Sequence, residues 1–179
     1  EKNPQKTDSL VIGSATHLVI KKMDLEKEIT EKTINQAIDE LVNSRCISAQ
    51  IAKKINIASI MKFFRSDLGK ILNGNNRIMR EWPFTYAASV SQVYPEKKNF
   101  DDEKIIIQGI IDMLVQTSDK AIIIDFKTDN INSAKVSQRA ENYKTQIEWY
   151  CKAAGVILGL KKVEGWLYFL NASESVKVV

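Results

Sequence analysis

The sequence predicts a mixed α/β domain of the α+β kind, in which helices flank a central sheet. Two observations predict this class. Apolar residues recur at helical spacing up to residue 74, whereas beyond residue 77 they gather in short runs rich in Ile and Val. One long helical pattern then separates the third of these runs from the last. Helices followed by strands, a helix and further strands indicate one sheet with helices packed against it.

Residues 9–74 are expected to be the mainly helical part. Thr30 is suited to cap the helix that follows it, because a Thr hydroxyl accepts hydrogen bonds from the first free backbone N–H groups. A Gly-Asn-Asn sequence at 74–76 is typical of a turn and ends this part. The expected helices cover residues 13–20, 33–44 and 58–65, and a further short helix begins at Ser66.

Residues 77–179 are expected to carry the sheet. Pro83 limits the first apolar run to an edge strand or a bent one, because proline cannot donate a ladder hydrogen bond. Gly159 is suited to end the long helix. The expected elements are strands at 77–86, 104–116, 120–126 and 163–170, a helix at 135–158, and a final strand at 176–179 that pairs with the one before it.

The composition limits the class of protein. The 179 residues are enough for one domain with a buried core, and 44% hydrophobic with 27% charged residues are ordinary values for a globular protein. No apolar run approaches the roughly 20 residues of a membrane helix. A net charge of +4 permits a polyanionic partner without requiring one. Because the chain starts at Glu1 within a polar stretch, we expect residues 1–179 to be a single domain excised from a longer polypeptide.

Two aspartates occur in the predicted neighbouring strands. If 104–116 and 120–126 form a hairpin whose turn is centred on residues 118 and 119, Asp112 lies opposite Asp125. Opposed residues share one face of the sheet, with Cβ atoms about 5 Å apart. Lys127 is two residues beyond Asp125 and therefore lies on the same face.

This pair of acids predicts a metal site. Two carboxylates held together between apolar strands repel each other unless a cation neutralises them, and oxygen ligands suit Mg²⁺ or Mn²⁺. Lys127 would hold an attacking water or neutralise a phosphate, as hydrolysis of a phosphodiester bond requires. The alternative interpretation is that Asp125 and Lys127 form a surface ion pair without a catalytic role. The register that brings in Asp112 favours the site.

Five segments resemble motifs of one family of enzymes. The residues at 109–112 and 124–129 read Gly-Ile-Ile-Asp and Ile-Asp-Phe-Lys-Thr-Asp, and together they resemble the G-x-x-D…D-[YF]-K-T-D signature of RecB-type nucleases in the PD-(D/E)XK superfamily. The segments 13–17, 80–84 and 143–150 resemble that family's G-T-A-x-H, R-E-x-P-F and Y-x-x-Q-x-x-x-Y motifs. Within the family the chain is most similar to the nuclease domains of AddA-type subunits of bacterial helicase–nucleases. A restriction-endonuclease-like core is the fold that this resemblance implies.

The resemblance also implies a ligand set. It places a metal ion, Mg²⁺ with Mn²⁺ as a substitute, on His17, Asp112, Asp125 and the main-chain carbonyl of Phe126, with Asp112, Asp125 and Lys127 as the catalytic residues. His17 taken alone would be an ordinary packed or surface histidine.

Glu81 is a further candidate metal ligand. The family pattern places it near the site, where it could bind a second metal or orient a water. The alternative is an exposed acid paired with Arg80.

The long helix is the expected DNA contact. Tyr143, Gln146 and Tyr150 share one face of it, and an amide amid aromatic residues needs partners. The resemblance implies that Gln146, then Tyr150 and Tyr143, contact DNA. Basic residues of the same region are either phosphate contacts or solvated charges, namely Lys135, Arg139 and Lys144.

The expected function is that of a metal-dependent DNA exonuclease domain, 3′→5′ on single strands, in a cytoplasmic bacterial helicase–nuclease that processes double-strand breaks for recombination. Its partners would be a single-stranded DNA end, upstream helicase domains and an AddB-like second subunit, and no membrane. The sequence lacks a G-x-x-x-x-G-K-[ST] loop, so ATP hydrolysis would belong to those other domains. The alternative is an inactive nuclease-like module for DNA binding or subunit docking, although such modules usually lose an acid or the lysine. A Cas4-type nuclease is disfavoured because two cysteines cannot form its four-cysteine site.

Overall fold

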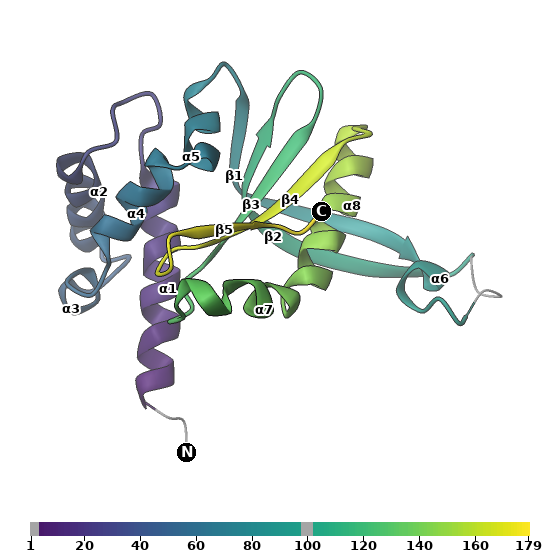
Figure 1. Ribbon diagram of the computed structural model, residues 1–179, viewed down its shortest axis with the longest axis horizontal. Coiled ribbons are helices and arrows are strands. Elements are labelled where there is room, and N and C mark those ends of the chain that lie inside the picture. Colours follow the sequence, from purple (N-terminus) through teal and green to yellow (C-terminus); the bar gives the residue numbers. More distant parts are fainter. Residues whose placement is uncertain (1–3, 98–101) are drawn as a thin grey trace.

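A five-stranded sheet in the order β1-β2-β3-β4-β5 forms the centre of the molecule (Figure 1). The computed structural model describes residues 4–97 and 102–179. Neighbouring strands run antiparallel except β3 and β4, which are parallel, so the expected mixed sheet is confirmed. The strands are β1 (Arg77–Ser89), β2 (Lys104–Gln116), β3 (Ala121–Lys127), β4 (Val163–Phe169) and β5 (Glu174–Lys177).

The N-terminal helices pack on one face of the sheet. Thr30 caps α2 as expected, and Thr33 completes a reciprocal capping box with it. The expected helix at 13–20 is only the C-terminal part of a longer one, which begins nine residues earlier, at Pro4, and continues to Lys22. These helices are α1 (Pro4–Lys22), α2 (Glu31–Asn43), α3 (Ala49–Ala52), α4 (Ile57–Arg65), α5 (Asp67–Lys70) and the 3₁₀ turn η1 (Ile71–Asn73).

The helix expected at 135–158 is two helices, and that prediction was wrong. A 3₁₀ turn, η3 (Ser133–Lys135), leads into α7 (Val136–Glu141), and the chain then turns before α8 (Lys144–Leu158). No proline or glycine marks the break, so the sequence pattern does not reveal it. Gly159 ends α8 with φ of 65°, the left-handed conformation that favours glycine.

Two apolar cores lie on opposite faces of the sheet. On one face Val19 and Phe63 of the N-terminal helices pack against Ile124 of β3. On the other face Ile147 and other α8 residues pack against Ile123. Alternation along β3 therefore directs neighbouring residues to different cores, and it directs Asp125 and Lys127 toward the α8 face.

Along the β1–β2 ribbon, the alternation of side chains between the two faces of the sheet is interrupted once. Met79 and Trp82 both pack in the α8 core, although they are three residues apart. The residue between them that breaks the alternation is Glu81, whose φ of 51° is unusual for a side chain other than glycine. Beyond Glu81 the ribbon projects from the rest of the sheet toward α6 (Val90–Val93) (Figure 1).

The same change occurs on β2. Leu114 and Ile111 both contribute to the α8 core, so alternation breaks at the residues between them. The paired residues Arg80–Met113 and Trp82–Ile111 flank the level at which Glu81 stands opposite Asp112. Two acidic side chains are thus brought together where both strands turn.

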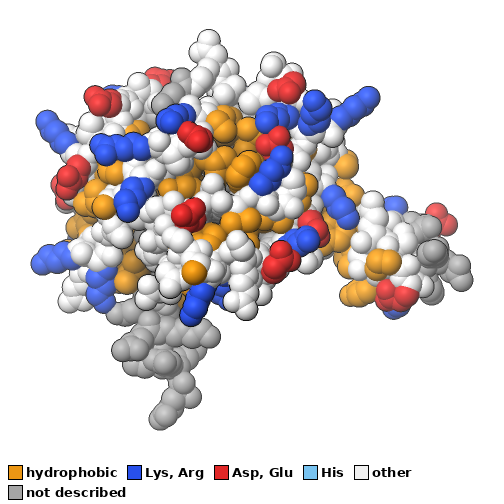
Figure 2. Space-filling view, viewed as in Figure 1, with side chains coloured by type: hydrophobic (Ala, Val, Ile, Leu, Met, Phe, Trp, Pro, Cys, Tyr) orange, Lys and Arg blue, Asp and Glu red, His pale blue; other side chains and the backbone are white. Residues whose placement is uncertain are grey.

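Charges of both signs are interspersed over the surface shown in Figure 2, with apolar side chains exposed between them. This agrees with the small net charge of +4. Within residues 4–97 and 102–179, no helix has the length and apolar character needed to cross a membrane.

Candidate metal and catalytic site

His17, Glu81 and Asp112 converge from three elements, α1, β1 and β2. Each can present one ligand atom so that the three atoms lie within 4.8 Å of one another. His17 Nδ1 is 3.3 Å from Asp112 Oδ1. A nitrogen and carboxylate oxygens at this separation are a donor set that a divalent cation can share.

Gly13 explains why α1 approaches the sheet closely enough to deliver His17. A Cβ atom at Gly13 would lie only 2.6 Å from Thr128 Oγ1, so a larger residue would require either the Thr128 side chain or α1 to move. Gly13 and His17 are four residues apart and share one helix face. The spacing Gly-x-x-x-His therefore places the imidazole on the helix face at which α1 comes closest to Thr128.

Glu81 owes its position to its backbone. A non-glycine residue in the left-handed region costs about 1–3 kcal/mol, and such strain is concentrated at functional sites. The preceding residue, Arg80, donates a hydrogen bond to the carbonyl of Met23 just beyond α1. The strand is thereby tied to the helix that carries His17, and the twist at Glu81 places its carboxylate at the cluster.

Asp112 links the two halves of the site. The register of β2 with β3 is the expected one, with Met113 opposite Ile124 and the turn centred on residues 118 and 119. The backbone pairing of β2 with β3 ends at Met113 and Ile124. One residue further along, Asp112 contacts β3 through its side chain. Its Oδ2 accepts a hydrogen bond of 2.8 Å from the backbone N–H of Phe126, while Oδ1 faces His17.

Asp125 and Lys127 form the second half of the site. Lys127 Nζ lies 2.6 Å from Asp125 Oδ2, and it donates a hydrogen bond of 3.2 Å to Gln146 Oε1. It also lies 4.1 Å from the ring centroid of Tyr143. These contacts hold the ammonium group at one point beside the acid.

Gln146 has partners for both ends of its amide. While Oε1 accepts from Lys127, Nε2 donates to the hydroxyl of Tyr150 at 2.7 Å. Tyr143 donates its hydroxyl to Asp129 and stacks its ring on Lys127. Of the three residues expected to contact DNA, Gln146 and Tyr143 therefore contact Lys127, and Tyr150 holds the Gln146 amide.

Neighbouring acids alter the pKa values of two groups at the site. Burial, and then the negative charge of Asp112, raise the pKa of Asp125 to about 6 despite the opposing effect of Lys127. Burial lowers the pKa of His17, but the hydrogen bond to Asp112 and the nearby carboxylates outweigh it, so its pKa is raised. Glu81, Asp112 and Asp125 thus lie close together among the basic residues Lys127, Lys21 and Arg80, and a divalent cation would further reduce the repulsion between the carboxylates.

A metal ion fits the residues that are present. A small cavity is lined by His17, Glu81, Asp112 and Phe126 among others. Within the described parts of the chain, Asp125 Oδ2 is buried without a hydrogen-bond partner of suitable geometry, even though Lys127 Nζ is close to it. Asp125 lies outside the group of three that share the 4.8 Å separation. Glu81 belongs to this group, since its ligand atom lies within 4.8 Å of those of His17 and Asp112. Metal binding by the Phe126 carbonyl stays a prediction.

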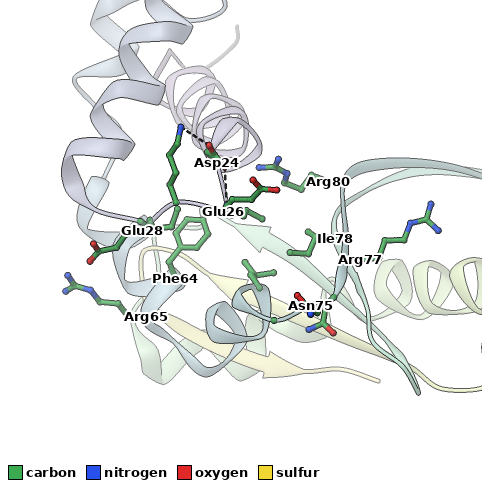
Figure 3. Close-up of a pocket in the computed structure, with 15 residues that line it drawn as sticks. Asp24, Glu26, Glu28, Phe64, Arg65, Asn75, Arg77, Ile78 and Arg80 are labelled. Carbon is green, nitrogen blue, oxygen red and sulfur yellow. Dashed lines mark hydrogen bonds and ion pairs between the residues drawn. The ribbon is translucent and has the colours of Figure 1, made fainter.

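A larger cavity lies beside this site rather than at it (Figure 3). It is bordered by the loop after α1, the end of α4 and the start of β1, with Asp24 and Glu26 on one side and Arg77 on another. Arg80 borders both cavities and turns toward the Asp24 loop. The mixed charges of its lining indicate no single ligand.

Sequence reasoning missed the residues that support the second half of the site. Asp129 accepts hydrogen bonds from Arg139 Nε at 2.7 Å and from the Tyr143 hydroxyl. Asn171 donates to the carbonyls of Thr128 and Asp129. Arg139 is thus engaged with Asp129, whereas the sequence left it as either a phosphate contact or a solvated charge. The Lys-Thr-Asp part of the motif was the available signal, because Asp129 follows Lys127 by two residues.

The fold and the convergence of acids, histidine and lysine at the ends of β2 and β3 define a class of nuclease. The sequence pattern of the PD-(D/E)XK nuclease superfamily matches residues 1–177, and the chain belongs to that superfamily.

The chain is also similar to part of a larger type of protein. Three relatives, each named as the A subunit of an ATP-dependent helicase/nuclease, come from Clostridium acetobutylicum, Thermoanaerobacter sp. strain X514 and Pediococcus pentosaceus. They are 31%, 36% and 35% identical to this chain over 170, 163 and 178 residues. The matches cover 93%, 90% and 97% of this chain. The chain spans only 13–14% of the length of these curated relatives.

Proposed function

We propose that this domain hydrolyses phosphodiester bonds of DNA with a divalent metal ion held by His17, Asp112 and Asp125, together with the Phe126 carbonyl and Glu81. The observation that carries the proposal is the junction of two groups. The cluster of His17, Glu81 and Asp112 adjoins the Asp125–Lys127 ion pair through the hydrogen bond from the Phe126 amide to Asp112. Mg²⁺ is the expected ion, and Mn²⁺ is expected to replace it.

The residues have separate tasks in this proposal. A bound cation would polarise a phosphoryl oxygen and lower the pKa of a bound water. Asp112 is held at both oxygens, by His17 and by the Phe126 amide, so its lone pairs keep a fixed direction. Asp125 is buried with Lys127 as its ion-pair partner, so its ionisation is costly despite the lysine, and a metal cation would lower that cost further.

Lys127 is proposed as the catalytic cation. Its ammonium is held by Asp125, Gln146 and the Tyr143 ring, so it can donate hydrogen bonds to an attacking water or a phosphoryl oxygen without reorganising. Gln146 is proposed to position Lys127 as well as to contact DNA, with Tyr150 and Tyr143 as further DNA contacts. The exposed residues Lys135 and Lys144 are candidate phosphate contacts.

The larger context is proposed from the relatives. By analogy with the helicase/nuclease relatives, we infer an exonuclease that degrades a single strand from its 3′ end as part of double-strand break processing for homologous recombination. Its partners would be the DNA end, helicase domains of a longer chain and an AddB-like second subunit, and its location the bacterial cytoplasm.

Degradation of labelled single-stranded DNA by the 179-residue chain tests the proposal. We expect cutting with Mg²⁺ or Mn²⁺ that stops in EDTA and in a folded Asp125→Ala variant. Cutting that persists in Asp125→Ala would place the catalytic site elsewhere. A wild-type chain that binds DNA and never cuts it would favour the docking-module alternative.

A further inference from the structure

Tyr86 of β1, Trp149 of α8 and Lys152 of α8 form a patch that we call the aromatic platform. The ring centroids of Tyr86 and Trp149 are 6.3 Å apart, with the ring planes inclined by 44°. Lys152 Nζ lies 4.5 Å from the Trp149 ring centroid. The platform thus combines two half-buried aromatic rings with an exposed cation.

Trp149 does not serve the core. Its helix neighbours Ile147 and Tyr150 belong to the α8 core, whereas Trp149 is absent from both apolar clusters of the described residues. Tyr86 packs on the α8 core, and its hydroxyl donates to Gln92 at 3.3 Å. Trp149 is thus held against Tyr86 but lies outside the core. This position indicates a role other than packing.

The platform is connected to Lys127 through residues of α8 and β1. Trp149 follows Gln146 by three residues, a rise of about 4.5 Å along the helix, and Gln146 contacts Lys127 directly. A second connection runs through Tyr150, whose ring packs edge-on against Phe84 at 5.5 Å. Phe84 precedes Tyr86 by two residues on the same face of the strand.

Gly109 leaves room for the packing of Tyr150 against Phe84. A Cβ atom at Gly109 would lie 2.8 Å from the Phe84 ring and 3.1 Å from the Tyr150 ring. Only glycine lets both rings lie against β2 at this level. Phosphodiester chemistry at Lys127 and aromatic stacking at Trp149 would therefore occur on adjoining parts of one surface.

We propose that the aromatic platform stacks an unpaired nucleobase of the strand that is being cut, with Lys152 near the adjoining phosphate. The proposal rests on the proposed nuclease function and specifies its substrate as DNA with splayed, unpaired bases. Bases of every kind stack on aromatic rings, and a cation beside the rings suits the phosphate that each base carries. A base within a duplex is already stacked and paired, so the platform favours single strands.

Binding measurements in an Asp125→Asn background, which should not cut, test the platform. The probes are a fluorescent oligothymidylate and the same backbone with abasic sites throughout. Trp149→Leu should weaken binding of the oligothymidylate roughly 5- to 100-fold and leave binding of the abasic strand unchanged, because one stacked base is lost. Trp149→Phe should retain most of the affinity.

Trp166→Leu is the matched control. Trp166 also carries a lysine on its ring, Lys177 at 5.9 Å, but it lies on β4 and packs toward the opposite core. It should bind both probes as the parent does. Thermal melts check that each variant is folded.

A second variant tests the platform without altering a ring. Lys152→Gln changes an exposed side chain and should lower the salt dependence of binding by about 0.7 in the log–log slope, as expected for one phosphate contact on a single strand.

The outcomes separate the two proposals. Unchanged binding in Trp149→Leu, an equal loss on both probes, or an unchanged salt slope in Lys152→Gln would overturn the platform, and the first would favour a protein-docking role for this face. If wild-type protein fails to cut with Mg²⁺ while the predicted binding pattern holds, the nuclease function fails and the platform stands.

Discussion

Replacing Asp125 by asparagine should stabilise the metal-free protein at alkaline pH. Burial raises the pKa of Asp125 from 3.8 to about 6, so the folded state resists its ionisation. A raised folded-state pKa means that the associated stability is full below the unfolded pKa and is lost as the pH rises through about 6. A pKa difference of about two between the folded and unfolded states corresponds to about 3 kcal/mol, and asparagine, which stays neutral, avoids that cost.

The assay is urea unfolding in EDTA, with wild type and Asp125→Asn compared at about pH 8 and about pH 4. We expect the variant to be more stable by about 1–3 kcal/mol at the higher pH and by less than about 1 kcal/mol at the lower. With Mn²⁺ the order should reverse, because a cation that binds only the folded wild type stabilises it by mass action.

Asp129→Asn is the matched control. Asp129 accepts hydrogen bonds from Arg139 and the Tyr143 hydroxyl, so its ionised form is well partnered, and the variant should lose stability. The reasoning is refuted if Asp125→Asn is destabilised in EDTA at the higher pH, or if its stability difference from wild type is the same at both pH values. Either result would mean that burial of the charge does not dominate at Asp125.

Four further predictions concern the site. Lys127→Met should reduce cutting at least roughly 100-fold while calorimetry still detects Mn²⁺ binding, because the lysine is not a ligand; unchanged cutting would exclude its catalytic role. Gly13→Ala should destabilise the fold by about 1–3 kcal/mol in thermal melts, because its Cβ would lie 2.6 Å from Thr128 Oγ1. Adding Thr128→Ala should restore most of that loss, and no restoration would show that another contact limits the approach of α1. Mn²⁺ affinity should fall as the pH drops through about 6, since Asp125 must lose its proton and His17, whose pKa is also raised, must be neutral to bind; a flat profile would count against both as ligands.

The register of the β2–β3 hairpin could be predicted from the sequence pattern. The turn at residues 118 and 119 and the alternation of the two strands were enough to predict the register in which Met113 faces Ile124. The pairing of Asp112 with Asp125, one level further along, stays a prediction. Strand registers of this kind depend on local geometry and on which side chains are apolar, and both can be read from the chain.

The bend at Glu81 could not be predicted in the same way. Its left-handed backbone follows from contacts among distant segments, namely the hydrogen bond from Arg80 to the end of α1 and the opposing strand at Asp112. The break between α7 and α8 is of the same kind, because residues 142 and 143 carry no helix-breaking side chain. There the interactions of Tyr143 with Asp129 and Lys127 accompany the turn.

The sequence alone predicted the type of fold, and it was enough to select Asp112, Asp125 and Lys127 as candidate site residues. Those features are properties of neighbouring residues, through periodicity, turn formation and spacing. The family resemblance indicated His17 and Glu81 near Asp112, but only the tertiary structure showed how they meet, that Gln146 holds Lys127, and that Trp149 lies outside the core beside Tyr86. These pairs are separated by long stretches of chain, and their distances depend on how closely α1 and α8 pack against the sheet, which glycines at positions 13 and 165 permit.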